Sequence, residues 1–292
     1  MESMRLRFRK SLIIWSKLGF MILTMTVSGS IWYLLWCLFR RWLDRRGYIK
    51  VIYYSLLTII VFFLFPIVYL SIVAGTVQGD VTVGNVFAMT PPVYQCLKVI
   101  GVVWTLGLIR EMILFGRDAK ILRSLKKRSF EADKTTQEIG RTFQSGHPGT
   151  KDIQIGCCYG LEGPMICGLY RMKILFPAEK KYSEEELRCL FTHEWMHRRH
   201  MDILIKRLVM WITCIHWFNP LTKQMLQMVN EWSEYYCDED TVEQLADHRL
   251  YYETLKVCAV DDKRKVPWNV SMMVEDKQTV LKRIERMRNV ER

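Results

Sequence analysis

Two long apolar stretches open the chain. Residues 18–39 and 51–74 contain no charged side chain, and about 20 apolar helical residues are enough to cross a bilayer. Both stretches therefore predict transmembrane helices. Pro66 lies inside the second stretch and predicts a kink there, because proline interrupts the helical hydrogen bonds.

A third apolar stretch, residues 93–115, carries the charged residues Lys98, Arg110 and Glu111. Lys98 and Arg110 lie toward opposite ends, so both side chains can extend to a membrane surface. We therefore interpret this stretch as a third span. Residues 1–115 would then form a membrane region with about three transmembrane helices.

The remainder of the chain shows shorter apolar periods that predict a compact, mainly α-helical domain with a small β-sheet. Residues 116–150 are polar and indicate a linker, and residues 261–292 indicate a second linker with a basic helix at about 275–288. Between them, residues 151–260 form the predicted domain. Its short strands are expected at 152–159, 165–170 and 173–176, and its helices from Ser183, at 201–218, at roughly 221–236 and at 239–258. Lys206 and Arg207 interrupt the helix at 201–218, which favours a buried or interfacial helix over a fourth span.

The net charge of +12 is concentrated beside the apolar stretches. Anionic lipid is the partner expected for that distribution, and we expect no direct binding of nucleic acid. The nine cysteines are irregularly spaced and do not predict a disulfide framework.

Charged residues between the spans predict their orientation. The loop from Arg40 to Lys50 is basic, whereas Asp80 is the only charged residue in the loop from Thr76 to Pro92. Basic residues are frequent again after residue 116. The positive-inside rule then places the first loop and the chain beyond residue 116 in the cytoplasm. Because successive spans cross the membrane in alternating directions, the N-terminus would lie outside. Its basic residues conflict with that placement, since the positive-inside rule favours the cytoplasm for them. Two explanations stay open: an amphipathic helix on the outer surface, or a first span that is not a simple crossing.

The motif His193-Glu194-Trp195-Met196-His197 carries the clearest chemistry. Histidines four residues apart lie on one face of a helix, where both imidazoles can bind one zinc ion. Glu194 is then placed to accept a proton from a water molecule at that ion. The motif follows a helix start at Ser183 with the capping-box residue Glu186 three positions later, which favours a rigid site.

A catalytic zinc site needs a third protein ligand. Glu234 is the stronger candidate, because Asp238 lies one turn further on the same helix face and could hydrogen-bond a ligand histidine. Glu231 competes for the ligand role. His200 is expected on the surface, and His216 is expected to pack within its apolar segment.

Several segments together resemble the cytoplasmic metalloprotease domain of the BlaR/MecR-type sensor-transducers. They are FTHEWMHRRHMDILIK at 191–206, HWFNP at 216–220, EYYCDED at 234–240, GLYRMKILFP at 168–177 and LKRIERM at 281–287. The resemblance implies a gluzincin-like zinc metallopeptidase with His193, His197 and Glu234 as zinc ligands and Glu194 as general base. It also implies that an edge strand around Gly168–Phe176 pairs with the substrate backbone, with Gly168, Leu169 and Tyr170 as substrate-binding residues. The family's membrane arrangement supports an external N-terminus.

The resemblance further implies a biological setting. The protein would be a multi-pass protein of a bacterial cell membrane that cleaves a cytoplasmic transcriptional repressor, or itself, in the antibiotic or cell-envelope response. The full sensor-transducers continue into another membrane helix and an external penicillin-binding domain, whereas this chain ends at Arg292. A short family member, a partner of a separate sensor protein and a truncated chain are the interpretations left open. Alternative functions are a membrane quality-control zinc protease and a non-catalytic receptor or scaffold stabilised by zinc.

Overall fold

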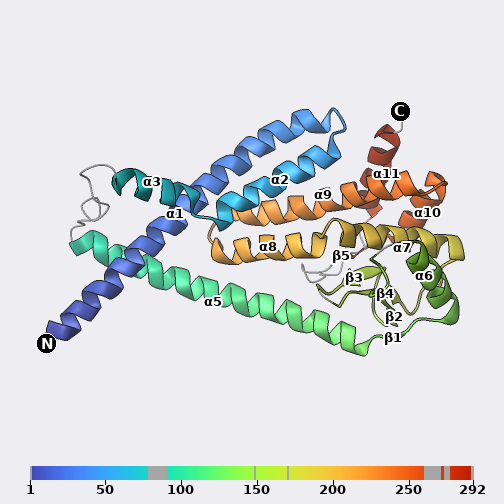
Figure 1. The fold of residues 1–292 in the computed structure, drawn as a ribbon, viewed down its shortest axis with the longest axis horizontal. Helices are drawn as coiled ribbons and strands as arrows, with labels where there is room; N and C mark the ends of the chain where they lie inside the picture. Colours follow the sequence, from blue (N-terminus) through green and yellow to red (C-terminus); the bar gives the residue numbers. More distant parts are fainter. Residues whose placement is uncertain are drawn as a thin grey trace. The chain divides into compact units, whose positions relative to one another are not determined.

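The computed structural model describes residues 2–77, 91–147, 149–169, 171–259, 271–272 and 277–290. Within these ranges the chain is mainly helical with one small sheet, as the sequence predicts (Figure 1). Two compact units are present. The first contains Met1–Leu114 and Trp211–Gln227, and the second contains Phe115–Met210 and Met228–Arg292.

The first unit contains α1 (Glu2–Asp44), α2 (Ile49–Leu64), α3 (Ile67–Val77) and the beginning of α5 (Pro91–Arg128). The segments Leu18–Asp44 and Val99–Arg128 are long and apolar enough to cross a membrane. The expected second span is two helices rather than one kinked helix. α2 ends at Leu64, and Phe65 is extended, because Pro66 lacks an N–H and disfavours a helical residue before it.

Helices α1 and α2 pack against each other along a continuous apolar seam. Ile52, Leu56 and Phe63 are fully buried, and a Cβ on Gly29 would lie only 2.7 Å from the Phe63 ring. Large apolar side chains such as Leu38 point outward, a pattern typical of a lipid-facing surface. Most of the predicted outer loop, residues 78–90, lies outside the described residues.

The segment Trp211–Gln227 joins α8 (Asp202–Ile215) to α9 (Pro220–Gln244) and packs with the first unit. Its backbone and side chains contact the apolar helices through polar groups. The Trp104 indole donates to the Ile215 carbonyl at 2.9 Å, and the Asn219 amide donates to the Ser30 hydroxyl at 2.9 Å. The expectation of a buried helix at 201–218, rather than a further span, agrees with this packing.

The second unit is built on a five-stranded sheet of order β1-β2-β4-β3-β5. The strands are β1 (Phe130–Glu131), β2 (Gln154–Cys158), β3 (Met165–Cys167), β4 (Lys173–Pro177) and β5 (Ser271–Met272). β2 and β4 are parallel, and the other pairs are antiparallel. The three strands expected at 152–176 are therefore present and form the centre of the sheet.

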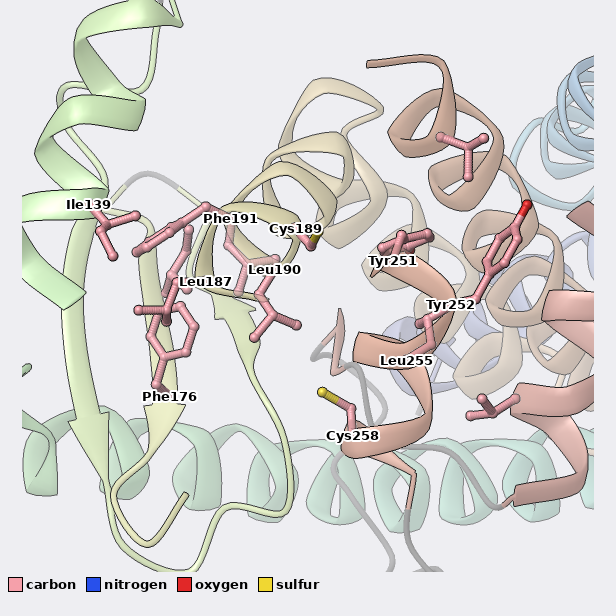
Figure 2. Close-up of a cluster of buried hydrophobic side chains, with 14 of the residues drawn as sticks. Ile139, Phe176, Leu187, Cys189, Leu190, Phe191, Tyr251, Tyr252, Leu255 and Cys258 are labelled. Carbon is pink, nitrogen blue, oxygen red and sulfur yellow. The ribbon is translucent and has the colours of Figure 1, made fainter. Parts of the chain in front are cut away.

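Helix α7 (Glu184–Arg199) packs on this sheet and carries the histidine motif. The predicted capping box is formed: the Ser183 hydroxyl accepts from the Glu186 N–H, and the Glu186 carboxylate accepts from the Ser183 N–H. Such a cap stabilises a helix by about 1 kcal/mol. On the sheet side, Leu187, Leu190 and Phe191 are buried in the core shown in Figure 2.

Part of the segment expected to be a linker is folded into this core. α6 (Lys134–Gly146) contributes Ile139, and Gly140 lets α6 approach closely, because a Cβ there would lie 2.2 Å from Ile155. At the other end of the unit, α10 (His248–Cys258) and α11 (Lys277–Val290) pack together. The break before α10 falls after Gln244 rather than near residue 237, so α9 is one long helix through the acidic segment.

Candidate metal centre

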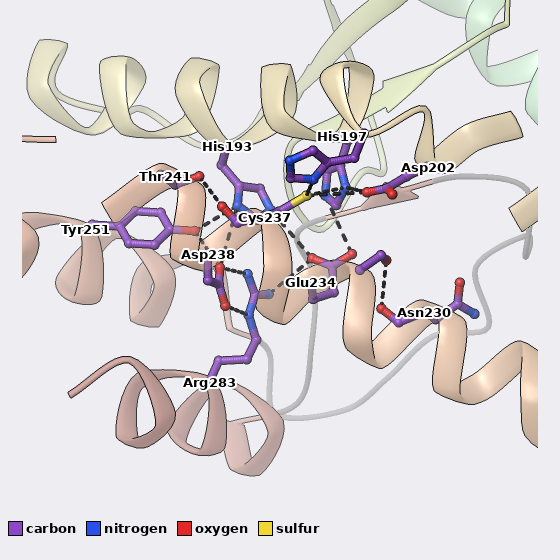
Figure 3. Close-up of polar contacts among 12 residues, drawn as sticks. His193, His197, Asp202, Asn230, Glu234, Cys237, Asp238, Thr241, Tyr251 and Arg283 are labelled. Atoms are coloured by element: carbon purple, nitrogen blue, oxygen red, sulfur yellow. Dashed lines mark hydrogen bonds and ion pairs between the residues drawn. The ribbon is translucent and has the colours of Figure 1, made fainter. Parts of the chain in front are cut away.

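Three side chains that could hold a metal ion converge between α7 and α9 in the second unit (Figure 3). His193 Nε2 lies 3.5 Å from Glu234 Oε2, and His197 Nε2 lies 3.6 Å from Glu234 Oε1. All three side chains are buried, and their ligand atoms lie within 4.8 Å of one another. The helical spacing of the two histidines brings their rings to the same side of α7, facing the carboxylate of α9.

The other nitrogen of each histidine is held by a hydrogen bond. His197 Nδ1 lies 2.6 Å from Asp202 Oδ2, which can only accept in its charged form, so Nδ1 carries the proton. His193 Nδ1 lies 2.8 Å from the Tyr251 hydroxyl. Neither Nε2 atom has a hydrogen-bond partner among the described residues. Two buried nitrogens without hydrogen-bond partners are costly unless a bound group interacts with them, and a metal ion is such a group.

Asp238 is connected to the candidate ligand His193 through the hydroxyl of Tyr251. The Tyr251 hydroxyl donates to Asp238 Oδ1 at 2.7 Å, which leaves its oxygen free to accept from His193 Nδ1–H. The direct separation of His193 Nδ1 and Asp238 Oδ1 is 3.7 Å. Asp238 thus lies near His193, as predicted, but Tyr251 connects the two side chains in place of a direct hydrogen bond.

Glu194 lies beside the three candidate ligands and is completely buried. Its two carboxylate oxygens have no hydrogen-bond partner within the described part of the chain. Burial raises the pKa of Glu194 to about 7, while the charge of His197 opposes that rise and the nearby Ile166 backbone also lowers it. A carboxyl with a pKa near neutrality can both accept and return a proton.

Charge balance around the centre also favours a divalent cation. The buried carboxylates are Glu194, Asp202, Glu234 and Asp238, and the buried cationic side chains among them are Lys206 and Arg283. When both imidazoles are neutral, as metal ligands must be, and all four carboxyls are ionised, these four negative and two positive charges leave a deficit that one divalent ion would neutralise. Two nitrogens and one carboxylate oxygen, with room for a fourth ligand, are the donor set of catalytic zinc sites.

The pKa directions follow from the same charges. Burial lowers the pKa of His193 and keeps its imidazole neutral. For His197, burial acts in the same direction, but the charges of Glu234 and Asp202 outweigh it and raise the pKa of the imidazole to about 10. Burial also opposes ionisation of Glu234, yet His197 and Lys206 hold the pKa of that carboxyl well below its usual range.

The competing ligand candidates lie elsewhere. Glu231 accepts from the Tyr235 hydroxyl at 2.9 Å and is not in the ligand cluster. His200 is buried, contrary to the expectation of a surface position, and its Nε2 lies 2.9 Å from Asp240 Oδ2. The reason is local: Met201 has a φ of 57°, so α7 ends there and His200 stays against α9.

A second group, His197 with Asp202 and Cys237, shares one histidine with the first. Cys237 Sγ lies 3.2 Å from His197 Nδ1, the nitrogen that already donates to Asp202. Burial, together with the charges of Asp202 and Glu234, raises the pKa of the Cys237 thiol well above its usual value. Asp202 and Cys237 both contact Nδ1 of His197, whereas Nε2 of the same ring faces Glu234.

The segment predicted to bind the substrate, Gly168–Phe176, is not one strand: it begins in the loop after β3 and continues into β4. Gly168 and Leu169 follow β3, and Tyr170 lies outside the described residues. β4 is hydrogen-bonded on both sides, so the expectation that this part of Gly168–Phe176 forms an edge strand is wrong. The chain folds back after β3, which puts β4 inside the sheet and leaves β3 next to the short β5.

Comparisons with known proteins identify a peptidase family. A family model described as BlaR1 peptidase M56 matches residues 20–287. The chain is 21% identical over 162 residues to the methicillin resistance mecR1 protein of Staphylococcus aureus, covering 54% of this chain and 28% of that protein. It is 28% identical over 79 residues to the regulatory protein BlaR1 of Bacillus licheniformis, covering 27% of this chain and 13% of that protein. The chain therefore spans less than a third of these curated relatives' length.

Proposed function

Because the chain belongs to the BlaR1 peptidase M56 family, we propose that it is a membrane zinc endopeptidase that works at the His193, His197 and Glu234 centre. The observation that carries the proposal is the pair of buried Nε2 atoms without hydrogen-bond partners, facing the Glu234 carboxylate. Glu194 beside them supplies the acid–base group that a hydrolytic reaction requires.

The side chains divide the work. A bound zinc ion would polarise the scissile carbonyl and make water more acidic. His193, His197 and Glu234 hold the ion, while Asp202 and Tyr251 fix the rings through their Nδ1 atoms. Glu194 takes a proton from the attacking water and gives it to the leaving amine. Its buried position keeps the pKa of that carboxyl high enough for both steps.

The substrate would approach as an extended strand along β3. The Ile166 backbone in β3 is close enough to Glu194 to lower its pKa, so a peptide paired with β3 would pass the acid–base group. In the structure Ser271 and Met272 of the same chain pair with Ile166 and Met165. That pairing favours the chain itself as one substrate, beside a cytoplasmic transcriptional repressor as the signalling substrate.

The membrane setting rests on sequence and helix length. Leu18–Asp44 and Val99–Arg128 have the length and apolar character of spans. We take α2 and α3 together as one further crossing between these two spans, so that the basic loop after Arg40 and the second unit both lie in the cytoplasm. Cysteine labelling with a membrane-impermeant reagent checks this: a residue introduced at position 85 should react in intact cells, and one at position 150 should not.

Glu194→Gln tests the proposed function in cells. The amide cannot act as a base, so substrates should accumulate uncut while zinc remains bound. Quantitative proteomics would identify these uncut substrates by comparing cells that carry the wild-type protein, Glu194→Gln or the control Glu231→Gln. Accumulation of one repressor supports signalling, and accumulation of many membrane proteins supports a quality-control protease. Identical proteomes and identical signalling in all three strains would support a non-catalytic zinc-stabilised scaffold instead.

A further inference from the structure

We propose that Arg283, on the C-terminal helix α11, is a positioning residue of the metal centre. This inference rests on the proposed zinc function and assigns a role to a helix far in sequence from the histidine motif. Arg283 is 1% exposed, and Val280, Ile284 and Met287 on the same helix are also buried. The helix therefore packs with its apolar face inward and carries a guanidinium into the interior.

A buried guanidinium is unfavourable unless anions compensate it. Arg283 Nε donates to Asp238 Oδ2 at 2.8 Å, and its Nη2 donates to Asp238 Oδ1 at 2.5 Å (Figure 3). Its Nη1 lies 3.5 Å from Glu234 Oε2. One side chain of α11 thus bridges two carboxylates that lie one turn apart on α9.

These contacts reach two of the three candidate ligands. Glu234 is contacted directly. His193 is reached through Asp238 and Tyr251, because Asp238 Oδ1 accepts from both Arg283 and the Tyr251 hydroxyl that accepts from His193. His197 has a separate support in Asp202. Arg283 therefore fixes the orientation of the Glu234 and His193 side of the centre.

The charge and the planar shape of the Arg283 guanidinium both contribute to holding Glu234 and Asp238 in place. Without Arg283, the carboxylates of Glu234 and Asp238 would repel each other in a buried site, and one of them would turn away from its present position. Lysine would restore the charge but not the planar fork that engages both oxygens of Asp238. Arg286 on the same helix provides a matched control, because its guanidinium lies over the rings of Trp232 and Tyr235, at 4.6 and 4.5 Å from their centroids.

The test is a zinc titration against a competing chelator on the full chain in detergent, with wild type, Arg283→Gln, Arg283→Lys and Arg286→Gln. Loss of such an outer contact typically weakens metal binding about 10–100-fold. We expect that loss for Arg283→Gln, an intermediate loss for Arg283→Lys, and wild-type affinity for Arg286→Gln. Wild-type affinity in Arg283→Gln, or an equal loss in Arg286→Gln, would overturn the inference, the second because helix packing alone would then explain the effect.

A double-mutant cycle keeps the test decisive if Arg283→Gln folds poorly. If Arg283 acts largely through Asp238, the variant that combines Asp238→Asn with Arg283→Gln should lose less zinc affinity than the sum of the two single losses, because the two side chains share one contact. Additive losses would contradict that route. The proposed function fails separately: a wild-type chain that binds no zinc removes the metal centre itself, whereas a wild-type chain that binds zinc and cleaves nothing removes only the peptidase activity.

Discussion

Buried histidines occur in both units, and what their nitrogens meet distinguishes them. His193 and His197 in the second unit and His216 in the first are all completely buried. His216 Nδ1 lies 2.8 Å from the Thr26 hydroxyl, and its Nε2 lies 3.1 Å from the Phe63 carbonyl. The other two histidines each leave Nε2 without a hydrogen-bond partner among the described residues, directed at Glu234.

The difference distinguishes a structural histidine from a candidate metal ligand. At His216 the neutral groups of α1 and α2 occupy both nitrogens, so the ring joins Trp211–Gln227 to the apolar helices. At His193 and His197 only Nδ1 is occupied, and carboxylates surround the rings. Burial alone therefore does not indicate a metal site. A buried histidine becomes a candidate ligand when one ring nitrogen is hydrogen-bonded and the other faces a carboxylate without a hydrogen bond.

Replacing the histidines should give the largest contrast. His193→Ala or His197→Ala removes one of three ligands, so we expect zinc to be lost or severely weakened, whereas His216→Ala should still bind about one zinc per chain. Metal analysis of the purified variants measures this. If His193→Ala kept its zinc, or if His216→Ala lost it, the two histidine sites would not differ in the way proposed.

Glu194→Gln separates binding from chemistry within the metal centre. Removing an acid–base group typically costs about 100-fold or more in rate, while the zinc ligands remain. We expect unchanged zinc content and a loss of peptide cleavage of that size. Rates on a substrate identified in cells, with Glu231→Gln as control, provide the measurement; undiminished cleavage by Glu194→Gln would remove Glu194 from the reaction.

Glu234 and Glu231 sharpen the comparison on a single helix. Glu234→Gln removes the carboxylate charge that offsets part of the zinc charge, so zinc affinity should fall strongly. Glu231→Gln should change zinc affinity little, because Glu231 is occupied by the Tyr235 hydroxyl. Asp238→Asn should be intermediate, with a loss of about 10–100-fold. If instead Glu231→Gln loses zinc and Glu234→Gln keeps it, the ligand lies one helical turn earlier.

The smallest expected effect concerns the stability of the first unit. Thr26→Val deprives His216 Nδ1 of the hydroxyl, and an unsatisfied buried polar group costs about 1–3 kcal/mol. Thermal unfolding in detergent should show a lower transition temperature with unchanged zinc content. Thr58→Val is the control, because the exposed Thr58 hydroxyl donates to the Ser55 carbonyl of its own helix. Loss of zinc in Thr26→Val would mean that the two histidine sites are not independent.

Local patterns in the sequence predicted the elements that carry the centre. The capping box and the histidine spacing depend on neighbours within one helix, so α7 and its motif follow directly from the sequence. Glu234 and Asp238 were also recognisable, because they share a helix face. The break at Pro66 was expected as a kink, since proline marks a helix interruption without stating how far the two halves separate.

The supports of the centre were not predictable in the same way. Tyr251 and Arg283 reach the centre from α10 and α11, and nothing in their local sequence distinguishes them from other aromatic or basic residues. Asp202 and His200 depend on the turn at Met201, whose positive φ no spacing rule indicates. Such contacts arise from tertiary packing, which joins segments far apart in the chain.

X-ray absorption spectroscopy of the zinc-loaded chain tests the central claim most directly, because it measures which atoms bind the ion. The His193, His197 and Glu234 centre predicts nitrogen and oxygen ligands at about 2.0–2.2 Å, two of them imidazoles, and no sulfur. The alternative group contains Cys237 and predicts a zinc–sulfur distance of about 2.3 Å. A spectrum without sulfur, unchanged in Cys237→Ser, is the predicted result; a sulfur ligand that disappears in Cys237→Ser would contradict the account.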